Sequence, residues 1–270
     1  MFVLLLSCWL RGGEVRDPVE TGLGRADAVY AEREDLARLD LAIEMYRGLL
    51  AEHPGEPRIL EALAEAWAAR AWGHVTDQRA AEYERARAYG LQCLELNPGF
   101  QSRVEFGSGR VTGGAIRQLT EEDHGCLDAT LVAWIRWVEL RGPAAAIDLE
   151  VIRLMARQSR LLSEGWVGPW GEAMSMVLVE GPLDRELPRS RALFQNAVES
   201  EPRLAVAHLD FARHQLVLEG ERSVFERELR NFDESYPAGA DGPWALENKA
   251  ARERAAKLYE DTSSVWAARW

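Results

Sequence analysis

Cysteine is scarce in this chain of 270 residues, occurring at positions 8, 93 and 126 alone. Three widely separated cysteines are too few for a disulfide framework or a zinc site. We therefore interpret Cys93 and Cys126 as small buried hydrophobic residues. Long uncharged apolar runs are also missing, and no run reaches the roughly 18 residues that cross a bilayer.

Basic residues are outnumbered in the chain. The 44 acidic side chains exceed the 32 basic ones, which gives a formal net charge of −12. A phosphate backbone repels a chain this acidic, so we exclude nucleic acid as a partner. The 47% of hydrophobic residues is enough to form a substantial core.

Alternation of apolar and polar residues is the third missing feature, and its absence predicts an all-α fold without a sheet. Pro57 and Pro143 are placed to open helices, and Thr120 with Asp123 is spaced as a capping box. A Pro143 helix would carry Ile147, Val151, Leu154 and Met155 on one face. Helices are expected at about 26–52, 78–96, 186–201, 204–219, 222–235 and 243–260, and also from Pro57, within 119–140 and from Pro143. A short apolar helix is expected after the Gly-Pro joint that begins at residue 164.

The segment 99–119 is rich in glycine and predicts a long irregular loop. Its Gly107-Ser108-Gly109 stretch superficially resembles a phosphate-binding loop. We reject that interpretation because no strand precedes the stretch and the full spacing is absent.

A spacing recurs at the ends of several predicted helices: apolar-x3-apolar-x2-apolar-apolar-x3-Pro. These offsets fall on one helical face, and they match the second helix of a tetratricopeptide unit. Pro202 and Pro237 are 35 residues apart, close to the roughly 34 of that repeat, whereas Pro54 and Pro98 are 44 apart. The pattern predicts an irregular array of tetratricopeptide-like helical hairpins. The matching positions are Ala42, Tyr46, Leu49, Leu50 and Pro54; Ala86, Gly90, Cys93, Leu94 and Pro98; Ser190, Phe194, Ala197, Val198 and Pro202; and, loosely, Phe225, Leu229, Phe232 and Pro237.

The chain begins with the apolar run MFVLLLSC. Its end, Leu5-Leu6-Ser7-Cys8, resembles a bacterial lipoprotein signal, in which the cysteine becomes lipidated. Only seven residues precede Cys8 and none is basic, whereas a working signal needs a charged start. We expect residues 1–20 to be a truncated signal and linker, with Cys8 as the lipidation site and residues 21–270 as one helical domain. The alternative is an incidental apolar N-terminus.

No convergent catalytic or metal-binding constellation is visible, so we predict neither an enzyme nor a cofactor. His208 and His214 are six residues apart and point to different sides of a helix. His124 and Cys126 have no orienting partner. The acids of 121–123 are better explained as first-turn residues that complement the helix dipole.

Tryptophan is the abundant feature, with 10 residues in the chain. Paired indoles at helical spacing can line an apolar groove or pore, and tryptophan is enriched at binding surfaces. Ordinary helix packing explains the pairs as well. The candidate ligand or pore residues are Trp134, Trp137, Trp166 and Trp170, with Arg136 and Arg141 placed to meet a carboxylate.

Six stretches in a fixed order carry a family resemblance: RLDLAIEMYRGLLAEHP, YGLQCLELNPGF, LTEEDHGCLDATLVAWIRWVEL, AIDLEVIRLMAR, RSRALFQNAVESEP and ALENKAARERAAKLYED. From about Ala28 to Trp266 the chain resembles the T components associated with TRAP transporters, the TatT family of periplasmic lipoproteins. The departures are the truncated signal and Gly90, which replaces a bulky residue and is expected to weaken packing there.

The resemblance implies a lipidated, periplasmic helical protein that assembles as a homotrimer with a pore. It also implies docking onto the solute-binding protein of a TRAP transporter and a role in the uptake of small ligands. Two alternatives remain open at this point: a tetratricopeptide-type lipoprotein scaffold of another envelope complex, and a cytoplasmic repeat scaffold.

Overall fold

The computed structural model describes residues 17–74, 77–104, 110–179, 186–237 and 242–267. The described residues form helices and connecting turns without a β-strand, which confirms the all-α prediction. Cys8 and the Gly107-Ser108-Gly109 stretch lie outside the described ranges, so the structure leaves the predictions for them untested.

Helices α1 to α7 make up the N-terminal half of the chain. They are α1 (Pro18–Tyr30), α2 (Leu36–Glu52), α3 (Pro57–Gly73), α4 (Arg79–Leu94), α5 (Pro98–Gln101), α6 (Gly113–Ile116) and α7 (His124–Arg141), with the 3-10 turn η1 (Glu121–Asp123) before α7.

The C-terminal half continues with a second set of helices. They are α8 (Leu149–Leu162), preceded by the 3-10 segment η2 (Gly142–Asp148), α9 (Val167–Val177), α10 (Leu187–Ser200), α11 (Ala205–Asp210), the π-helical η4 (Phe211–Leu216), α12 (Val217–Glu219), α13 (Arg222–Arg230), α14 (Phe232–Ser235), η5 (Gly242–Trp244), α15 (Ala245–Glu260) and α16 (Thr262–Ala267).

Side-chain caps and prolines fix the helix starts. Pro57 occupies the first turn of α3 as predicted, because its missing N–H has no partner to lose there. The Thr120–Asp123 capping box is also confirmed: the Thr120 backbone N–H donates to Asp123 Oδ2 at 2.8 Å. Asn97 caps α5 by accepting from the backbone N–H of Gly99 at 2.8 Å.

The single helix expected at 26–52 is wrong, because α1 ends at Tyr30 and α2 starts at Leu36. Asp35 begins the second helix by accepting the backbone N–H of Ala37 at 2.8 Å, and Asp17 caps the first in the same way. Two separate helices can fold back on each other as a hairpin. The turn between the two helices contains Arg33, which contacts Glu247 of α15.

The helix expected from Pro143 starts later, because residues 142–148 form the 3-10 segment η2 and α8 begins at Leu149. Ile147 consequently lies off the α8 face and is 80% exposed, which contradicts its predicted place beside Met155. Met155 itself is fully buried. The segment expected to be an irregular loop contains the short helices α5 and α6.

The recurring helix-end spacing marks buried positions. Ala42, Ala86, Phe194 and Phe225 are each 0% exposed, and Tyr46 is 1% exposed. The spacing therefore identifies the inward face of α2, α4, α10 and α13. The closer likeness to tetratricopeptide units stays a prediction.

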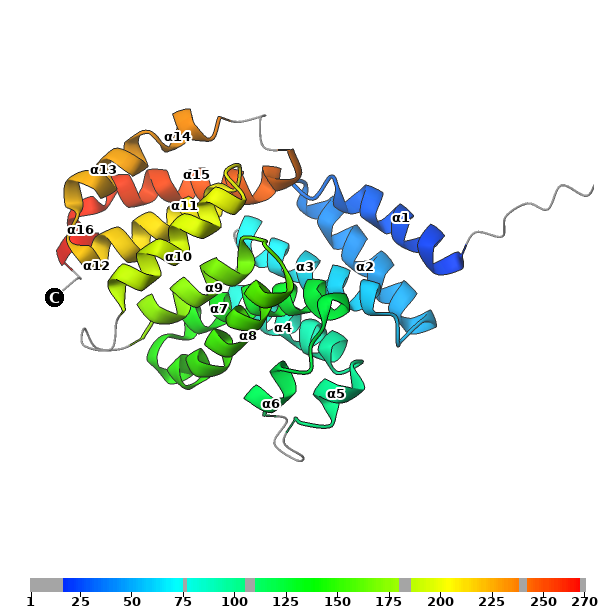
Figure 1. Cartoon of the computed structure of the whole chain (residues 1–270). Coiled ribbons are helices and arrows are strands. Elements are labelled where there is room, and N and C mark those ends of the chain that lie inside the picture. The colour runs from blue at the N-terminus through cyan, green and yellow to red at the C-terminus, as the bar shows by residue number, and fades with distance from the viewer. Residues whose placement is uncertain (1–16, 75–76, 105–109, 180–185, 238–241, 268–270) are drawn as a thin grey trace, which may run out of the picture.

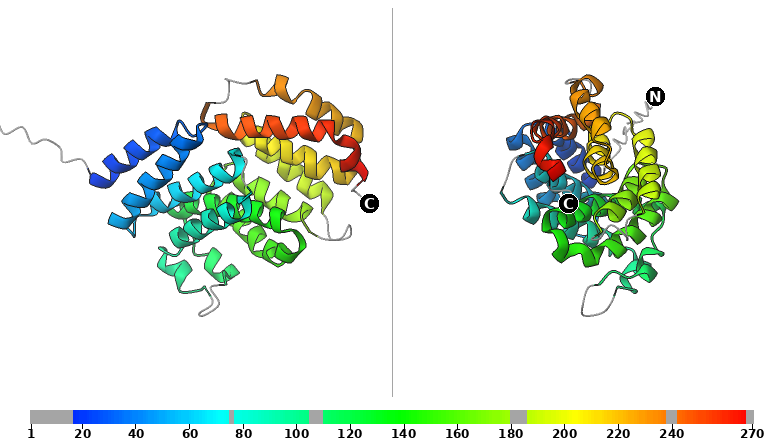
Figure 2. Two further views of the ribbon diagram at one scale, coloured as in Figure 1. Left: turned by 180° about the vertical axis from the view of Figure 1, so that it is seen from behind. Right: turned by 90° about the vertical axis from the view of Figure 1, so that its left-hand side faces the viewer.

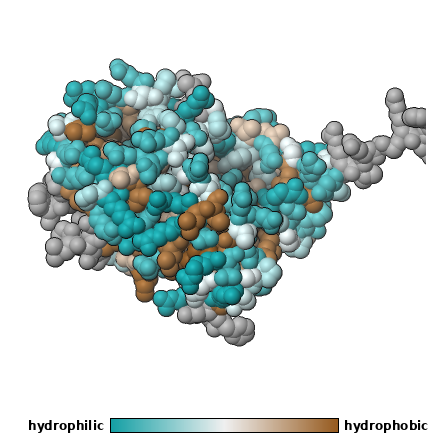
Figure 3. Space-filling view, viewed as in Figure 1, coloured by the Kyte–Doolittle hydropathy of each residue, from teal (hydrophilic) through white to brown (hydrophobic). Residues whose placement is uncertain are grey.

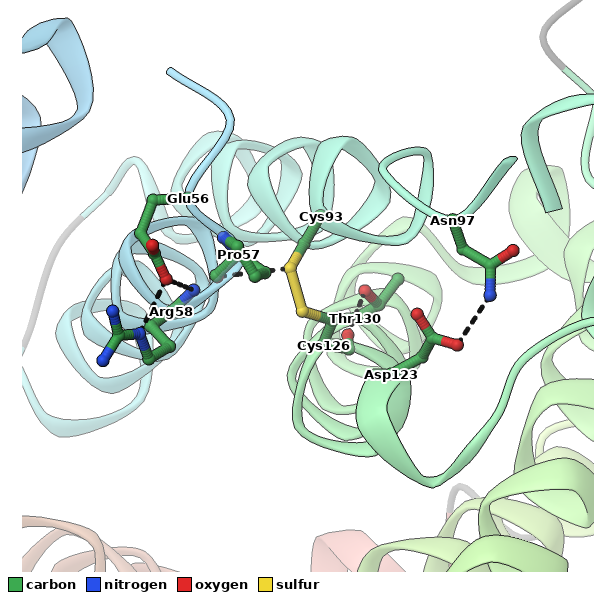
Figure 4. The surroundings of a disulfide bond; sticks show 8 residues. All are labelled: Glu56, Pro57, Arg58, Cys93, Asn97, Asp123, Cys126 and Thr130. Carbon is green, nitrogen blue, oxygen red and sulfur yellow. Dashed lines mark hydrogen bonds and ion pairs between the residues drawn. A yellow bond between two sulfur atoms is a disulfide. The ribbon is translucent and has the colours of Figure 1, made fainter. Parts of the chain in front are cut away.

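Cys93 and Cys126 are buried as predicted, but they are joined by a disulfide rather than free (Figure 4). The bond links α4 to α7 across 33 residues, with the two Cα atoms 5.8 Å apart. Sequence alone shows neither partner, because only the packing of α4 on α7 brings the two cysteines together.

Gly90 lies on the same interface. A Cβ atom at this position would come within 2.2 Å of Thr130 Oγ1 and 3.0 Å of Thr130 Cα. The glycine therefore permits the close approach of α4 and α7 rather than weakening it, which corrects the expectation from sequence.

Removing the disulfide should destabilise the chain by about 2–4 kcal/mol, because the cross-link restricts the unfolded state. The test is urea unfolding of the wild type and of Cys93→Ala/Cys126→Ala, each with and without a reductant. Reductant should lower the wild-type midpoint to that of the double variant and leave the double variant unchanged. An equal wild-type urea midpoint with and without reductant would show that the bond does not form.

Helix α3 joins the hydrophobic cores of the protein. Leu63 belongs to the core of α1 to α3, Leu60 to the central core of α4 to α10, and Trp72 to the C-terminal core. Figures 1 and 2 show α1 and α2 at one end of the molecule and α13 and α16 at the other. The face seen in Figure 3 is mainly hydrophilic, with hydrophobic residues gathered near its lower middle.

Helix α15 begins beside the turn between α1 and α2, contacts α3 and runs from there toward the C-terminus (Figure 1). Arg33, in the turn after α1, donates to Glu247 of α15 with Nη2 3.0 Å from Oε2. This contact joins residues more than 200 positions apart. Residues of α1, α3, α7 and α15 line one cavity beside this contact.

Candidate functional site

A cavity of about 530 Å³ opens between α3, α7 and the starts of α9 and α15. We call it the aromatic cavity, because six aromatic residues contribute to its walls. They are Tyr30, Trp72, Tyr83, Trp166, Trp170 and Trp244. Trp166 packs edge-to-face against Trp170 and Trp244, with ring centroids 5.4 and 6.3 Å apart.

Small residues create this space. Ala68 and Ala69 of α3 and Ala129 of α7 line the cavity with single methyl groups. Gly125 has a more specific role, because a Cβ atom there would lie 2.1 Å from Glu61 Oε1. The glycine leaves room for the Glu61 carboxylate at the cavity wall.

A second cavity of about 470 Å³ lies between α3, α7, α11 and α15. We call it the arginine cavity, because Arg79, Arg136, Arg213 and Arg254 line it. Arg254 Nη1 is buried and has no hydrogen-bond partner among the described residues. Burial, together with the charges of Arg79 and Arg136, lowers the pKa of Arg254 to about 10.

Trp72, Tyr83 and Arg136 line both cavities and so form the wall between them. The guanidinium carbons of Arg136 and Arg254 lie 4.4 and 3.7 Å from the Trp72 ring centroid. The indole N–H of Trp72 donates to the Glu247 carbonyl at 3.1 Å, which fixes the ring. The two cavities are therefore neighbours separated by one layer of side chains.

Arg136 is held by a buried ion pair with Asp210 of α11. The guanidinium donates to both carboxylate oxygens, at 3.1 and 2.5 Å, and also to Glu139 at 2.9 Å. Trp170 donates its indole N–H to the same Asp210 carboxylate at 2.9 Å. Burial alone would lower the pKa of Arg136, but the two carboxylates outweigh burial and raise it.

The structure divides the six residues proposed from sequence into two groups. Arg136, Trp166 and Trp170 line the aromatic cavity. Trp134, Trp137 and Arg141 line neither cavity and lie around Arg87 on another side of α7. Arg87 packs on both of these indole rings, with its guanidinium carbon 5.1 and 4.4 Å from their centroids, and Arg141 packs on Trp137 at 5.4 Å.

Their polar contacts differ as well. Trp134 is buried and donates its indole N–H to Asp148 at 2.8 Å. Arg136 is already bound by Asp210 and Glu139, so it has little capacity to hold a ligand carboxylate. Of the residues predicted from sequence, Trp166 and Trp170 therefore remain the candidates for a ligand site.

Comparison with known families decides what kind of protein carries these cavities. The model of the TRAP transporter T-component family matches residues 36–266, which is most of the chain and includes nearly all of both cavity linings. The chain belongs to the TRAP transporter T-component family. No curated protein matches the chain. The family assignment links this T component to TRAP-type transport and fits a location in the cell envelope.

The histidines considered from sequence have separate surroundings in this T component. His208 stacks on Tyr236 with ring centroids 5.0 Å apart, and burial lowers its pKa to about 4. His214 lies beside Glu139, with Nε2 3.4 Å from Oε1. His124 pairs with Asp128, with Nε2 3.0 Å from Oδ2, and its hydrogen bond to that carboxylate raises the pKa of His124. No two of these three histidines therefore share a site.

Sequence reasoning missed two carboxylates of the aromatic cavity, Glu61 and Glu65. They stand four residues apart on α3 and therefore on one helical face. Glu65 is accessible to water, but protein atoms crowd around it within the cavity. This confinement, together with Glu61, raises the pKa of Glu65 to about 7, and confinement likewise raises the pKa of Glu61. The sequence signal that could have indicated them is the pair of acidic residues, Glu61 and Glu65, beside the apolar stripe of α3.

Glu65→Gln should raise the melting temperature at pH 8 more than at pH 5. The folded carboxyl releases its proton near pH 7, whereas the usual value is 4.5, so the folded state binds the proton more tightly than the unfolded state. Stability therefore falls as pH rises from about 4.5 to 7 and stays low above that window. Glutamine removes this loss.

Thermal melts of the wild type and variant at both pH values test this expectation. Glu44→Gln is the matched control, because Glu44 lies on the exposed face of α2. An equal effect of Glu65→Gln at both pH values would show that the carboxyl is not confined.

Proposed function

We propose that this T component is a periplasmic binding and adaptor protein of a TRAP-type transporter. In this proposal it docks a solute-binding protein and holds a small ligand in the aromatic cavity. Assembly as a homotrimer, and passage of the ligand through an oligomeric pore, belong to the same proposal and rest on the family resemblance.

The single observation that carries the proposal is the aromatic cavity in a chain of this family. A volume of about 530 Å³ is in the range of pockets for small ligands, roughly 300–1,000 Å³. Its walls combine indole rings and small aliphatic side chains with a few polar groups, the usual lining of binding sites. The adjoining arginine cavity offers a second chamber beyond Trp72. We therefore propose binding rather than catalysis as the activity.

The disulfide supports a place outside the cytoplasm. Structural disulfides persist in oxidising compartments such as the periplasm and are rare in the cytosol. None of the helices in the described part of the chain is both long and apolar enough to span a membrane.

We also propose Cys8 as the site of a lipid anchor. When the chain is expressed behind a complete lipoprotein signal, Cys8 should be acylated and the protein should fractionate with membranes, whereas Cys8→Ala should be soluble. Mass spectrometry of the natural protein decides the matter: an unmodified Met1 with a free Cys8 thiol contradicts the anchor.

Binding of a neutral fluorescent probe tests the aromatic cavity. Phenylnaphthylamine should bind the wild-type protein saturably, because the cavity offers an apolar, ring-lined space. Trp166→Ala removes a half-buried cavity ring and should weaken binding about tenfold. Trp137→Ala is the matched control, since this equally half-buried indole lines neither cavity.

Melting curves separate loss of binding from loss of folding. Trp170 is fully buried, so Trp170→Ala should mainly lower the melting temperature. Equal probe affinities for Trp166→Ala and wild type would place the ligand elsewhere. Weaker binding by Trp137→Ala alone would favour the Arg87 surface instead.

A further inference from the structure

Two carboxylates of the aromatic cavity are without a partner. Glu61 and Glu65 line its α3 wall, and neither forms a hydrogen bond or ion pair with another described residue. The other charged side chains of the cavity are matched: Arg33 with Glu247, His124 with Asp128, and Arg136 with Asp210. The described walls therefore hold an excess of negative charge.

Aromatic rings face the same space. The faces of Tyr and Trp rings attract cations, because their π-electrons make each face negative. Tyr30 already accepts one cation in this way, with the Arg33 guanidinium carbon 4.7 Å from its ring centroid. Trp166 and Trp244 stand at right angles to each other, so they present surfaces in two directions.

Tyr83 adds a polar group to this wall. Its side chain is 1% exposed, and its hydroxyl has no hydrogen-bond partner among the described residues. A buried hydroxyl without a partner costs free energy, and a ligand in either adjoining cavity is placed to relieve that cost.

We propose that the aromatic cavity selects ligands that carry a positively charged amino group on an apolar body, with the charge held between Glu61 and Glu65. The inference rests on the proposed function, in which this cavity is the ligand site. The apolar body lies against the indole rings, and the ammonium N–H groups donate to the two carboxylates. Charge-assisted hydrogen bonds of this kind are stronger than neutral ones.

An anionic ligand fits this cavity poorly. Glu61 and Glu65 would repel a carboxylate, and Arg136 is already bound to Asp210 and Glu139. The unpaired Arg254 nitrogen belongs to the arginine cavity, on the other side of Trp72. A preference for anions would therefore point to the arginine cavity instead.

Protonation of Glu65 should oppose binding of the cation. Because its pKa is raised to about 7, Glu65 is ionised at pH 8 and mainly neutral at pH 5.5. Ligand affinity should consequently be higher at pH 8. The other titratable or charged groups near Glu65 are Glu61 on α3, Asp27 and Tyr30 on α1, Arg33 after α1, His124 and Asp128 on α7, and Glu247 on α15.

Three matched probes test the inference on the full chain: phenylbutylammonium, phenylbutanol and phenylbutanoate. They share one apolar body and differ in charge. At pH 8, isothermal titration should show the ammonium binding at least about tenfold more tightly than the alcohol, and the carboxylate binding most weakly. Glu61→Gln/Glu65→Gln should remove this preference while leaving alcohol affinity within about twofold, which also reports that the variant is folded.

Glu253→Gln is the matched control, because Glu253 lines the arginine cavity alone, and it should keep the preference for the ammonium. The inference is overturned if the carboxylate binds as tightly as the ammonium, or if the double variant retains the preference. If the alcohol binds and Trp166→Ala weakens it, but charge has no effect, the proposed function stands and this inference alone fails. If none of the three probes binds, both fail.

Discussion

Asp210→Asn should destabilise the folded chain by about 3–5 kcal/mol, because it removes the carboxylate that pairs with the buried Arg136 guanidinium through two hydrogen bonds and leaves Glu139 as its one counter-charge among the described residues. Arg136 and Asp210 are only 3% and 1% exposed, so water cannot replace the lost partner. The substitution also weakens the acceptor for the Trp170 indole N–H. Urea unfolding followed by circular dichroism measures the change.

The matched control is Asp233→Asn on α14, where the carboxylate is exposed, and its effect should stay within about 0.5 kcal/mol. A loss below about 1 kcal/mol for Asp210→Asn is the size of an exposed ion pair. That result would mean that the pair between α7 and α11 is absent or solvated, and that the wall between the cavities is wrongly described.

Phe194→Ala should cost about 3–5 kcal/mol, as expected for emptying a fully buried aromatic position. Phe194 is 0% exposed on α10 and packs edge-to-face on Phe211, with ring centroids 5.9 Å apart. The same urea titration gives the loss. Leu161→Ala is the control, because Leu161 is 79% exposed. Similar small losses for both variants would contradict the inward orientation of this helix face.

Most of the helices could be predicted from local signals. Pro57 and the Thr120–Asp123 capping box fix helix starts through contacts within a few residues. The recurring spacing identified Phe194 and Phe225 as buried because helical periodicity alone decides which face they share. Local chemistry was insufficient at Asp35, where a cap divides one apolar stretch into two helices.

Long-range pairing was beyond the reach of sequence patterns. The Cys93–Cys126 disulfide and the Arg136–Asp210 ion pair join helices that meet only in the folded chain. Gly90 shows the same limit, because the need for a glycine there arises from the close approach of Thr130 on another helix. A single sequence shows such residues without their partners.

The candidate site was predicted in part for the same reason. Trp166 and Trp170 were visible as a pair beside a Gly-Pro joint, and both line the aromatic cavity. Trp134 and Trp137 looked equivalent in sequence, yet their face of α7 turns toward Arg87. Glu61 and Glu65 were overlooked because charged residues on a helix usually face open solvent, whereas these two line a cavity.

The most direct test of the account is complex formation with the solute-binding protein of a TRAP transporter from the same organism. Sedimentation velocity of the full chain carrying Cys8→Ala, with and without that protein, reports both the oligomer and the complex. The account predicts a trimer alone and a larger, saturable complex in the mixture, and no complex with the solute-binding protein of an unrelated transporter. Two species that sediment independently at all concentrations would contradict the adaptor role.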